Sequence, residues 1–184
     1  FYYRPRIDKE SLAKYSDGLI CLTACAKGEV PMAMARGDAA AAQAAAQSLL
    51  DIFGKDRFFI EVQEHESLDS PNIREPLIAL ARKMGVSLVA TNDVHFLRPD
   101  DFDAHEVLCC LNTGRLITDE NRLRYPKDVY LKTPEEMRDM FSDIPEACDN
   151  TLAIAERCNV KLDLGARHAP VYRPEDGSTP EDFL

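Results

Sequence analysis

The stretch Ser87-Leu88-Val89-Ala90-Thr91-Asn92-Asp93-Val94-His95-Phe96-Leu97 carries the strongest pattern in the sequence. It follows Gly85 and begins with apolar and β-branched residues, as a buried strand of a parallel sheet does. Its far end is polar. Because residues two apart share one face of a strand, Asp93 and His95 should point the same way. A carboxylate and an imidazole at the carboxyl end of a strand lie where α/β proteins place their chemistry.

Two interpretations of this pair are open from the pattern alone. Asp93 and His95 can belong to a metal or catalytic site, or they can simply hydrogen-bond to each other and to a nearby helix end. An Asp-x-His sequence is short and common, so further residues are needed to favour the first interpretation.

Composition excludes several classes of protein. The chain has 184 residues, 32 acidic and 22 basic, with a net charge of −10. This length suits one domain, and the acidic surface disfavours binding to duplex DNA while suiting cations. We expect a cytoplasmic protein, since no apolar run approaches membrane-spanning length and no signal peptide opens the chain. The cysteines form no Cys-x-x-Cys pair, which indicates a reducing compartment; they are Cys21, Cys25, Cys109, Cys110, Cys148 and Cys158.

Alternating strands and helices predict an α/β fold. We expect parallel neighbouring strands over 19–25, 57–63 and 88–93, with the polar end of the last reaching residue 97. Helices are expected at about 9–15, 31–53 with a break at Gly37, 72–84, 101–111, 134–141 and 145–158. Residues 112–129 read as irregular, and 161–184 as a linker. Three strands would leave both sheet edges open, so the pattern favours a piece of a larger barrel or sheet.

Cys25 ends the first expected strand, as His95 ends the third. If the strands are parallel neighbours, Cys25, Asp93 and His95 gather at one rim, and they suit Zn²⁺ or Mn²⁺. The alternative is that Cys25 is a small buried core residue. Glu61 is a candidate to orient a metal ligand, although an acid at a strand end is more often ion-paired. His65 lies just beyond the second strand, and His105 is expected to be a capping or surface histidine.

The stretch 88–97 resembles the Asp-x-His strand of the PHP (polymerase and histidinol phosphatase) domain in bacterial DNA polymerase III alpha subunits. Five other stretches resemble the same family in the same order, namely 18–20, 25–31, 104–110, 130–137 and 150–159. Such an ordered series is far more specific than any single motif.

The resemblance implies a partial PHP-type (β/α) barrel with parallel strands and outer helices. PHP domains carry a multinuclear metal site, and Cys25, Asp93 and His95 match its last ligands by position. The earlier ligands, including a His-x-His motif, would lie before residue 1. Residues 1–160 would be the C-terminal part of the PHP domain, and 161–184 a linker toward the polymerase palm.

The resemblance also implies DNA-directed DNA synthesis by the parent chain, and a metal-dependent phosphoesterase that acts in some members as a 3′–5′ proofreading exonuclease. The alternatives are a non-catalytic scaffold that docks an exonuclease subunit, and a free-standing PHP phosphatase. The implied partners are the rest of the alpha subunit, the exonuclease subunit and DNA. We expect the fragment alone to be inactive, with Zn, Mn or Mg bound weakly or not at all.

Overall fold

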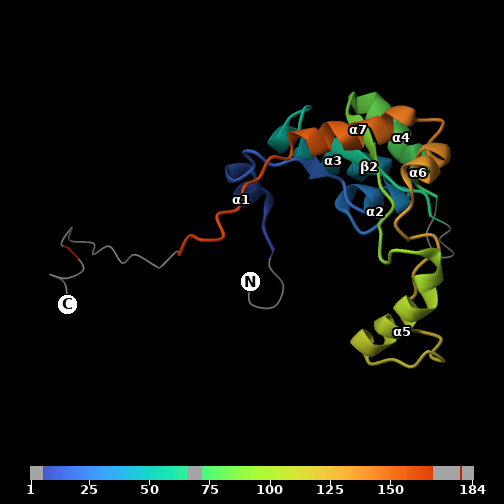
Figure 1. Cartoon of the computed structure of the whole chain (residues 1–184). Coiled ribbons are helices and arrows are strands. Elements are labelled where there is room, and N and C mark those ends of the chain that lie inside the picture. Colours follow the sequence, from blue (N-terminus) through green and yellow to red (C-terminus); the bar gives the residue numbers. More distant parts are fainter. Residues whose placement is uncertain (1–5, 66–71, 168–178, 180–184) are drawn as a thin grey trace.

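A parallel sheet of three strands lies at the centre of the computed structural model, which describes residues 6–65, 72–167 and 179 (Figure 1). The strands are β1 (Cys21–Leu22), β2 (Phe58–Val62) and β3 (Ser87–Ala90), in the order β1-β2-β3. Cys21 lies opposite Phe58, and Ile60 lies opposite Leu88. The prediction of parallel neighbouring strands is therefore confirmed, whereas the described residues form an open sheet and not a closed barrel.

The expected helices form within a few residues of their predicted ends. They are α1 (Lys9–Lys14), α2 (Glu29–Ala35), α3 (Ala39–Phe53), α4 (Arg74–Met84), α5 (Phe102–Thr113), α6 (Pro134–Met140) and α7 (Pro145–Arg157), with a short 3-10 helix η1 (Pro99–Asp101). Local signals explain their limits. Asp38 accepts from the backbone N–H of Ala41 and caps α3, whereas Gly54, at φ 74°, ends it. Thr133 and Glu136 form a capping box at the start of α6.

β1 is much shorter than the predicted strand 19–25, and that prediction is wrong in its length. The chain leaves the sheet after Leu22, and Thr23 Oγ1 accepts the backbone N–H of Glu61 at 2.9 Å. The Thr23 hydroxyl oxygen thus accepts the hydrogen bond that a main-chain carbonyl of a longer β1 would accept from β2. Leu19, where the predicted strand begins, lies outside β1 and is 48% exposed.

β3 ends at Ala90, short of the polar residues that were assigned to it. Asp93 has φ 41°, which is incompatible with an extended strand, so the argument from a period of two fails beyond the strand. The chain instead pairs with a segment near residue 130. The His95 N–H donates to the Val129 carbonyl at 2.8 Å, and Phe96 forms a parallel bridge with Tyr130.

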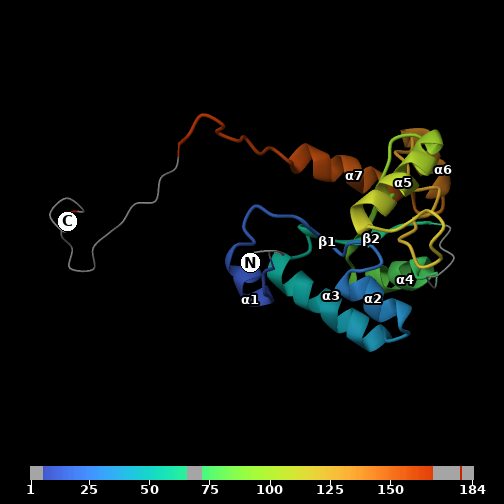
Figure 2. The same ribbon diagram turned by 90° about the horizontal axis from the view of Figure 1, so that it is seen from below.

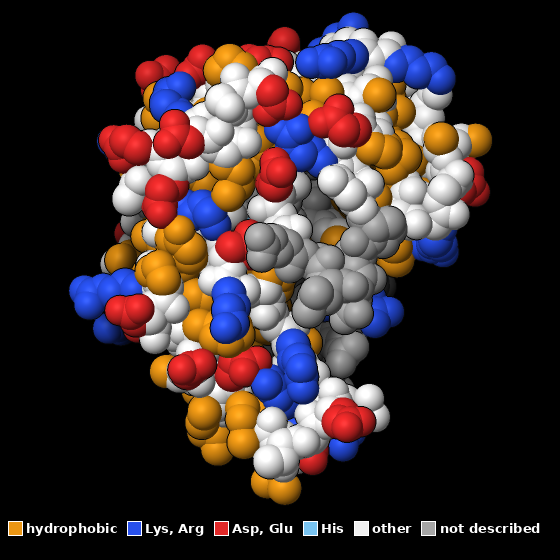
Figure 3. Space-filling model, turned by 90° about the vertical axis from the view of Figure 1, so that its right-hand side faces the viewer, with side chains coloured by type: hydrophobic (Ala, Val, Ile, Leu, Met, Phe, Trp, Pro, Cys, Tyr) orange, Lys and Arg blue, Asp and Glu red, His pale blue; other side chains and the backbone are white. Residues whose placement is uncertain are grey.

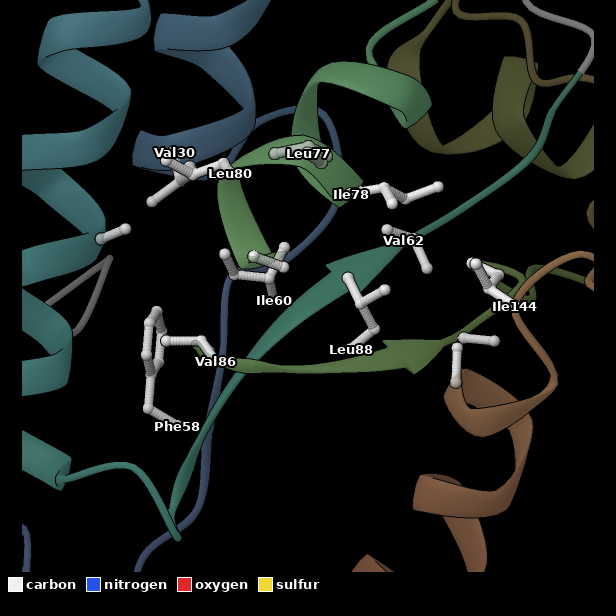
Figure 4. Close-up of a cluster of buried hydrophobic side chains, with 14 of the residues drawn as sticks. Val30, Phe58, Ile60, Val62, Leu77, Ile78, Leu80, Val86, Leu88 and Ile144 are labelled. Atoms are coloured by element: carbon white, nitrogen blue, oxygen red, sulfur yellow. The ribbon is translucent and has the colours of Figure 1, made fainter. Parts of the chain in front are cut away.

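The core lies between β2, β3 and the helices around them. Phe58, Ile60 and Val62 alternate along β2 and are fully buried (Figure 4). Figure 2 shows the strands between α7 and the group formed by α2, α3 and α4. α7 packs along β3, and Asn150 Nδ2 donates to the Leu88 carbonyl at 2.7 Å. The outer edge of β3 is therefore partly covered, which reduces its tendency to pair with another chain.

α5 and residues 114–127, which we call the arm, project from this body (Figure 1). Apolar side chains of the arm lie open to solvent at the lower end of Figure 3; the most exposed are Val107, Leu108, Leu111 and Leu116. The arm is held together by Arg122, whose Nη1 and Nη2 donate to the two carboxylate oxygens of Glu106 at 2.6 and 2.8 Å. This ion pair joins α5 to the segment that follows it.

This ion pair predicts an acid-sensitive arm. The hydrogen bond from Arg122 lowers the pKa of Glu106. A carboxylate whose pKa is lowered by folding stabilises the fold above its unfolded pKa, about 4.3 for glutamate, and that contribution is lost as the pH falls through the lowered value. Glu106→Gln should therefore lower the free energy of unfolding at pH 7. Below about pH 4.3, the difference in this free energy between the variant and the unmodified chain should shrink. Urea unfolding from pH 7 to pH 3 tests this, with the exposed Glu120→Gln as control. An equal deficit at every pH would contradict the prediction.

Only the first residues of the predicted linker, together with Thr179, lie within the described part of the chain. Residues 161–167 form no helix or strand and are exposed, whereas the rest of the predicted linker, apart from Thr179, lies outside the described residues. Within residues 6–65, 72–167 and 179, no helix is both long and apolar enough to span a membrane.

Candidate functional site: a pocket at the carboxyl ends of the strands

A pocket of about 430 Å³ lies where the chain leaves the three strands. It is lined by residues from beyond β1, from the end of β2 and from beyond β3, among them Cys25, Glu61, His65, Asp93 and His95. All three predicted metal ligands and the predicted orienting acid therefore face one cavity. Parallel strands place their carboxyl ends at the same edge of a sheet, which is why residues so distant in sequence meet here.

Cys25 reaches the pocket from a tight turn after β1 and not from the strand itself. Ala24 has φ 66°, a left-handed conformation that costs a residue with a side chain roughly 1 kcal/mol or more. The Gly28 N–H donates to the Cys25 carbonyl at 2.8 Å and closes the turn. A Cβ atom on Gly28 would lie 2.1 Å from the Thr23 carbonyl oxygen, so only glycine fits there.

Asp93 and His95 also reach the pocket through irregular backbone. His95 Nδ1 lies 2.5 Å from the Asp93 carbonyl oxygen. A carbonyl only accepts hydrogen bonds, so Nδ1 carries the proton, and in the neutral ring Nε2 is then the nitrogen with the lone pair. This is the arrangement in which a histidine ligates a metal through Nε2, because the bond at the other nitrogen fixes the tautomer and the ring.

The carboxylate of Glu61 is held from the side by two neighbours. Thr91 Oγ1 donates to Glu61 Oε1 at 2.5 Å, and Gln63 Nε2 donates to the same oxygen at 3.1 Å and to Thr91 Oγ1 at 2.9 Å. Among the residues that the structure describes, Glu61 has no ion-pair partner, and its carboxylate is oriented at the wall of the pocket. Such an acid suits either a metal ligand or a group that positions one.

Tyr125 and His105 were missed as parts of this region. The Tyr125 ring lies against His95 with centroids 4.0 Å apart, and it lines the pocket. His105, on α5, has its ring centroid 5.3 Å from that of Tyr125 and 5.9 Å from that of His95. His105 is therefore neither a helix cap nor a simple surface residue. No sequence pattern points to Tyr125, since it lies in the irregular segment after α5.

Arg74 and Cys21, a charged group and a thiol near the pocket, have pKa values that are raised for different reasons. Arg74 lines the pocket, and its pKa is raised mainly by the hydrogen bond to Asp143, so it is a permanent cation. Burial raises the pKa of the Cys21 thiol, which keeps it protonated and unreactive inside β1. All six cysteines are free thiols in the structure.

The side chains that line the pocket are of the types that bind a divalent metal, but too few of them lie close together, among the described residues, to hold one. Thiolate, carboxylate and imidazole are ligands of Zn²⁺ and Mn²⁺. Over the described ranges, however, no three such side chains converge closely enough to hold an ion. The pocket therefore presents part of a donor set, and the metal itself stays a prediction.

Comparison with known proteins identifies the family. Residues 1–65 match the PHP domain model. The chain is 42% identical over 182 residues to DNA polymerase III subunit alpha of Pseudomonas fluorescens, covering 97% of this chain and 15% of that protein. The proteins of the same name from Treponema pallidum and Thermus aquaticus are 38% and 39% identical, over 100% of this chain and 16% of each relative.

The chain thus spans only about a sixth of the length of the relatives it matches. The match runs through the whole chain in one continuous order, as the resemblance of the separate stretches predicts. Over its full length, the chain is therefore homologous to a segment of the DNA polymerase III alpha subunit, and it begins with sequence of a PHP domain.

Proposed function

We propose that the polypeptide to which this segment belongs is a DNA-directed DNA polymerase of the cytoplasm, and that the pocket is part of a metal-dependent phosphoesterase site acting as a 3′–5′ exonuclease. The observation that supports the exonuclease site is that Cys25, Asp93 and His95 all line one cavity at the carboxyl ends of the strands. The names of the relatives support the first half.

Each side chain has a role that its contacts suit. His95 offers Nε2, because Nδ1 is engaged with the Asp93 carbonyl. Asp93 and Cys25 supply an anionic oxygen and sulfur, and Glu61 is oriented by Thr91 to support them. A divalent ion held by these residues together with further ligands would supply Lewis-acid chemistry suited to the hydrolysis of a phosphodiester. The remaining ligands would come from other parts of the full-length polypeptide, so the 184-residue chain by itself should have no nuclease or polymerase activity.

Asp93→Asn and His95→Ala in the full-length polypeptide should each reduce exonuclease rates by about 100-fold or more, while DNA synthesis is retained. The reason is that each change removes a donor at the cavity without touching a polymerase site. Release from 3′-labelled single-stranded DNA in Mn²⁺ or Zn²⁺ measures the effect. Glu146→Gln, on the exposed surface of α7, is the matched control. Unchanged nuclease rates in both site variants would refute the assignment.

A second candidate is a non-catalytic scaffold that docks a separate exonuclease subunit. It is favoured by one observation, the lack of three converging metal donors among the described residues. A full-length protein that has no metal and no nuclease activity, yet co-purifies with an exonuclease, would establish the scaffold. No observation favours a free-standing phosphatase.

A further inference from the structure

The outer side of α5 carries apolar side chains that no described residue covers. Val107, Leu108 and Leu111 recur at the spacing of one helix face, and Leu116 follows just beyond the end of the helix; we call these four residues the stripe. Leu108 is 62% exposed and Leu111 is 75% exposed. A single exposed apolar residue needs no explanation, whereas several side by side mark an interaction surface.

The stripe is exposed although the inner side of α5 makes its contacts within the chain. The ring of His105 lies 5.3 Å from that of Tyr125, measured between centroids, and Glu106 accepts two hydrogen bonds from Arg122. Cys110, one turn further along, is buried. These contacts fix which side of α5 faces the chain, and they leave the stripe facing outward (Figure 3).

The backbone around the stripe is held in one shape by hydrogen bonds. Gly114, at φ 65°, ends α5, and the Arg115 N–H donates to the Cys110 carbonyl at 3.0 Å. Thr113 Oγ1 donates to the Cys109 carbonyl at 2.7 Å. A surface that is ordered before it binds loses less conformational entropy on docking. The stripe is therefore a pre-organised apolar surface.

The charges of α5 indicate what kind of surface fits the stripe. The helix contains Asp103 and Glu106 but no Lys or Arg, and Glu106 is already paired with Arg122. The centres of protein interfaces are depleted in charged residues in the same way. Phosphate backbones, by contrast, are bound through Lys and Arg. The stripe therefore suits an apolar protein surface and not a nucleic acid.

We infer that the stripe docks against an apolar surface in another part of the full-length polypeptide. The chain covers only 15–16% of the length of the relatives that it matches, so most of the surface that can bury the stripe lies outside these residues. A surface on the same polypeptide meets the stripe at a high effective concentration. A second copy is disfavoured, because it would bring together two chains that each carry a net charge of −10. The inference does not depend on the proposed nuclease site.

The test is hydroxyl-radical footprinting of the purified full-length polypeptide, with oxidation of individual leucines measured by mass spectrometry. Leu108 and Leu111 should be oxidised at least about tenfold more slowly than in a synthetic peptide of residues 102–118 at the same radical dose, because the centre of an interface excludes water. Oxidation of both leucines at the rate of the peptide overturns the inference, whatever a nuclease assay of the same protein shows.

A charged substitution tests whether the stripe itself makes the contact. Leu111→Glu in the full-length polypeptide places a carboxylate in the apolar interface, and the oxidation rate of Leu108 should rise to within about twofold of its rate in the peptide. Leu152→Glu is the matched control, because Leu152 is 59% exposed on α7, and it should leave Leu108 protected. Undiminished protection of Leu108 in Leu111→Glu overturns the inference. Should this variant fail to fold, footprinting of the unmodified protein decides by itself.

Two further results identify other occupants of the stripe. Protection of Leu108 that disappears on dilution of about 100-fold identifies a second copy of the polypeptide, since only association between molecules depends on concentration. Protection that appears only after another protein is added identifies a separate partner. Either result overturns docking within one polypeptide, whereas protection that survives dilution of the purified protein supports it.

Discussion

Phe58→Ala should lower the free energy of unfolding of the chain by about 3–5 kcal/mol. Phe58 begins β2, the central strand, and its side chain is fully buried. It lies beside Val86 in the cluster that joins the sheet to the helices (Figure 4). Alanine removes the ring and leaves a cavity into which the surrounding close-packed side chains relax only in part.

Urea unfolding of the 184-residue chain measures this effect, and the slope with urea should stay unchanged. Leu162→Ala is the control, because its side chain is 75% exposed and should alter stability by no more than about 0.5 kcal/mol. Since small domains are stable by only about 5–15 kcal/mol, the expected loss is a large part of the total. A cost below about 1 kcal/mol would show that β2 is not the centre of the core.

Gly28→Ala should destabilise the chain by about 3 kcal/mol or more, through overlap and not through backbone strain. Gly28 has φ −68°, which any residue adopts, but its added Cβ would meet the Thr23 carbonyl oxygen at 2.1 Å. The obstacle is backbone and cannot rotate away. The turn must therefore open, which should also displace Cys25, whose carbonyl accepts the Gly28 N–H.

Gly165→Ala is the matched control, since its Cβ would meet only a side-chain atom of Asp163 at an ordinary 3.6 Å. Thermal unfolding should place this variant within about 0.5 kcal/mol of the unmodified chain. A Gly28→Ala variant of native stability would mean that the turn carrying Cys25 tolerates a different path, and that the pocket is less rigid than its contacts indicate.

The helices and the parallel direction of the strands could be predicted because their causes lie within a few residues. Asp38 caps α3 through a residue three positions on, and Gly85 ends α4 at φ 63°. The alternation of such helices with apolar runs leads to parallel strands, and that prediction holds. The gathering of Cys25, Glu61, Asp93 and His95 at one pocket follows from the same rule about the ends of parallel strands.

The ends of the strands depend on partners far along the chain. β1 stops where Thr23 Oγ1 takes the N–H of Glu61, 38 residues away. The chain beyond β3 is held by Asn92, whose amide reaches the Asp128 carbonyl 36 residues on. No local pattern indicates which side chain will replace a backbone group, because the choice depends on what the fold brings within hydrogen-bond distance.

The residue types and spacing of the sequence therefore specify the helices, the parallel order of the strands and the chemistry available at their ends. The tertiary structure alone decides the left-handed turns at Ala24 and Asp93, the projection of the arm and the approach of Asp128 to His65. The physical reason is the range of the interactions. Helix caps and apolar periodicity act over a few residues, whereas the walls of the pocket form by contacts between segments that meet only once the sheet has assembled.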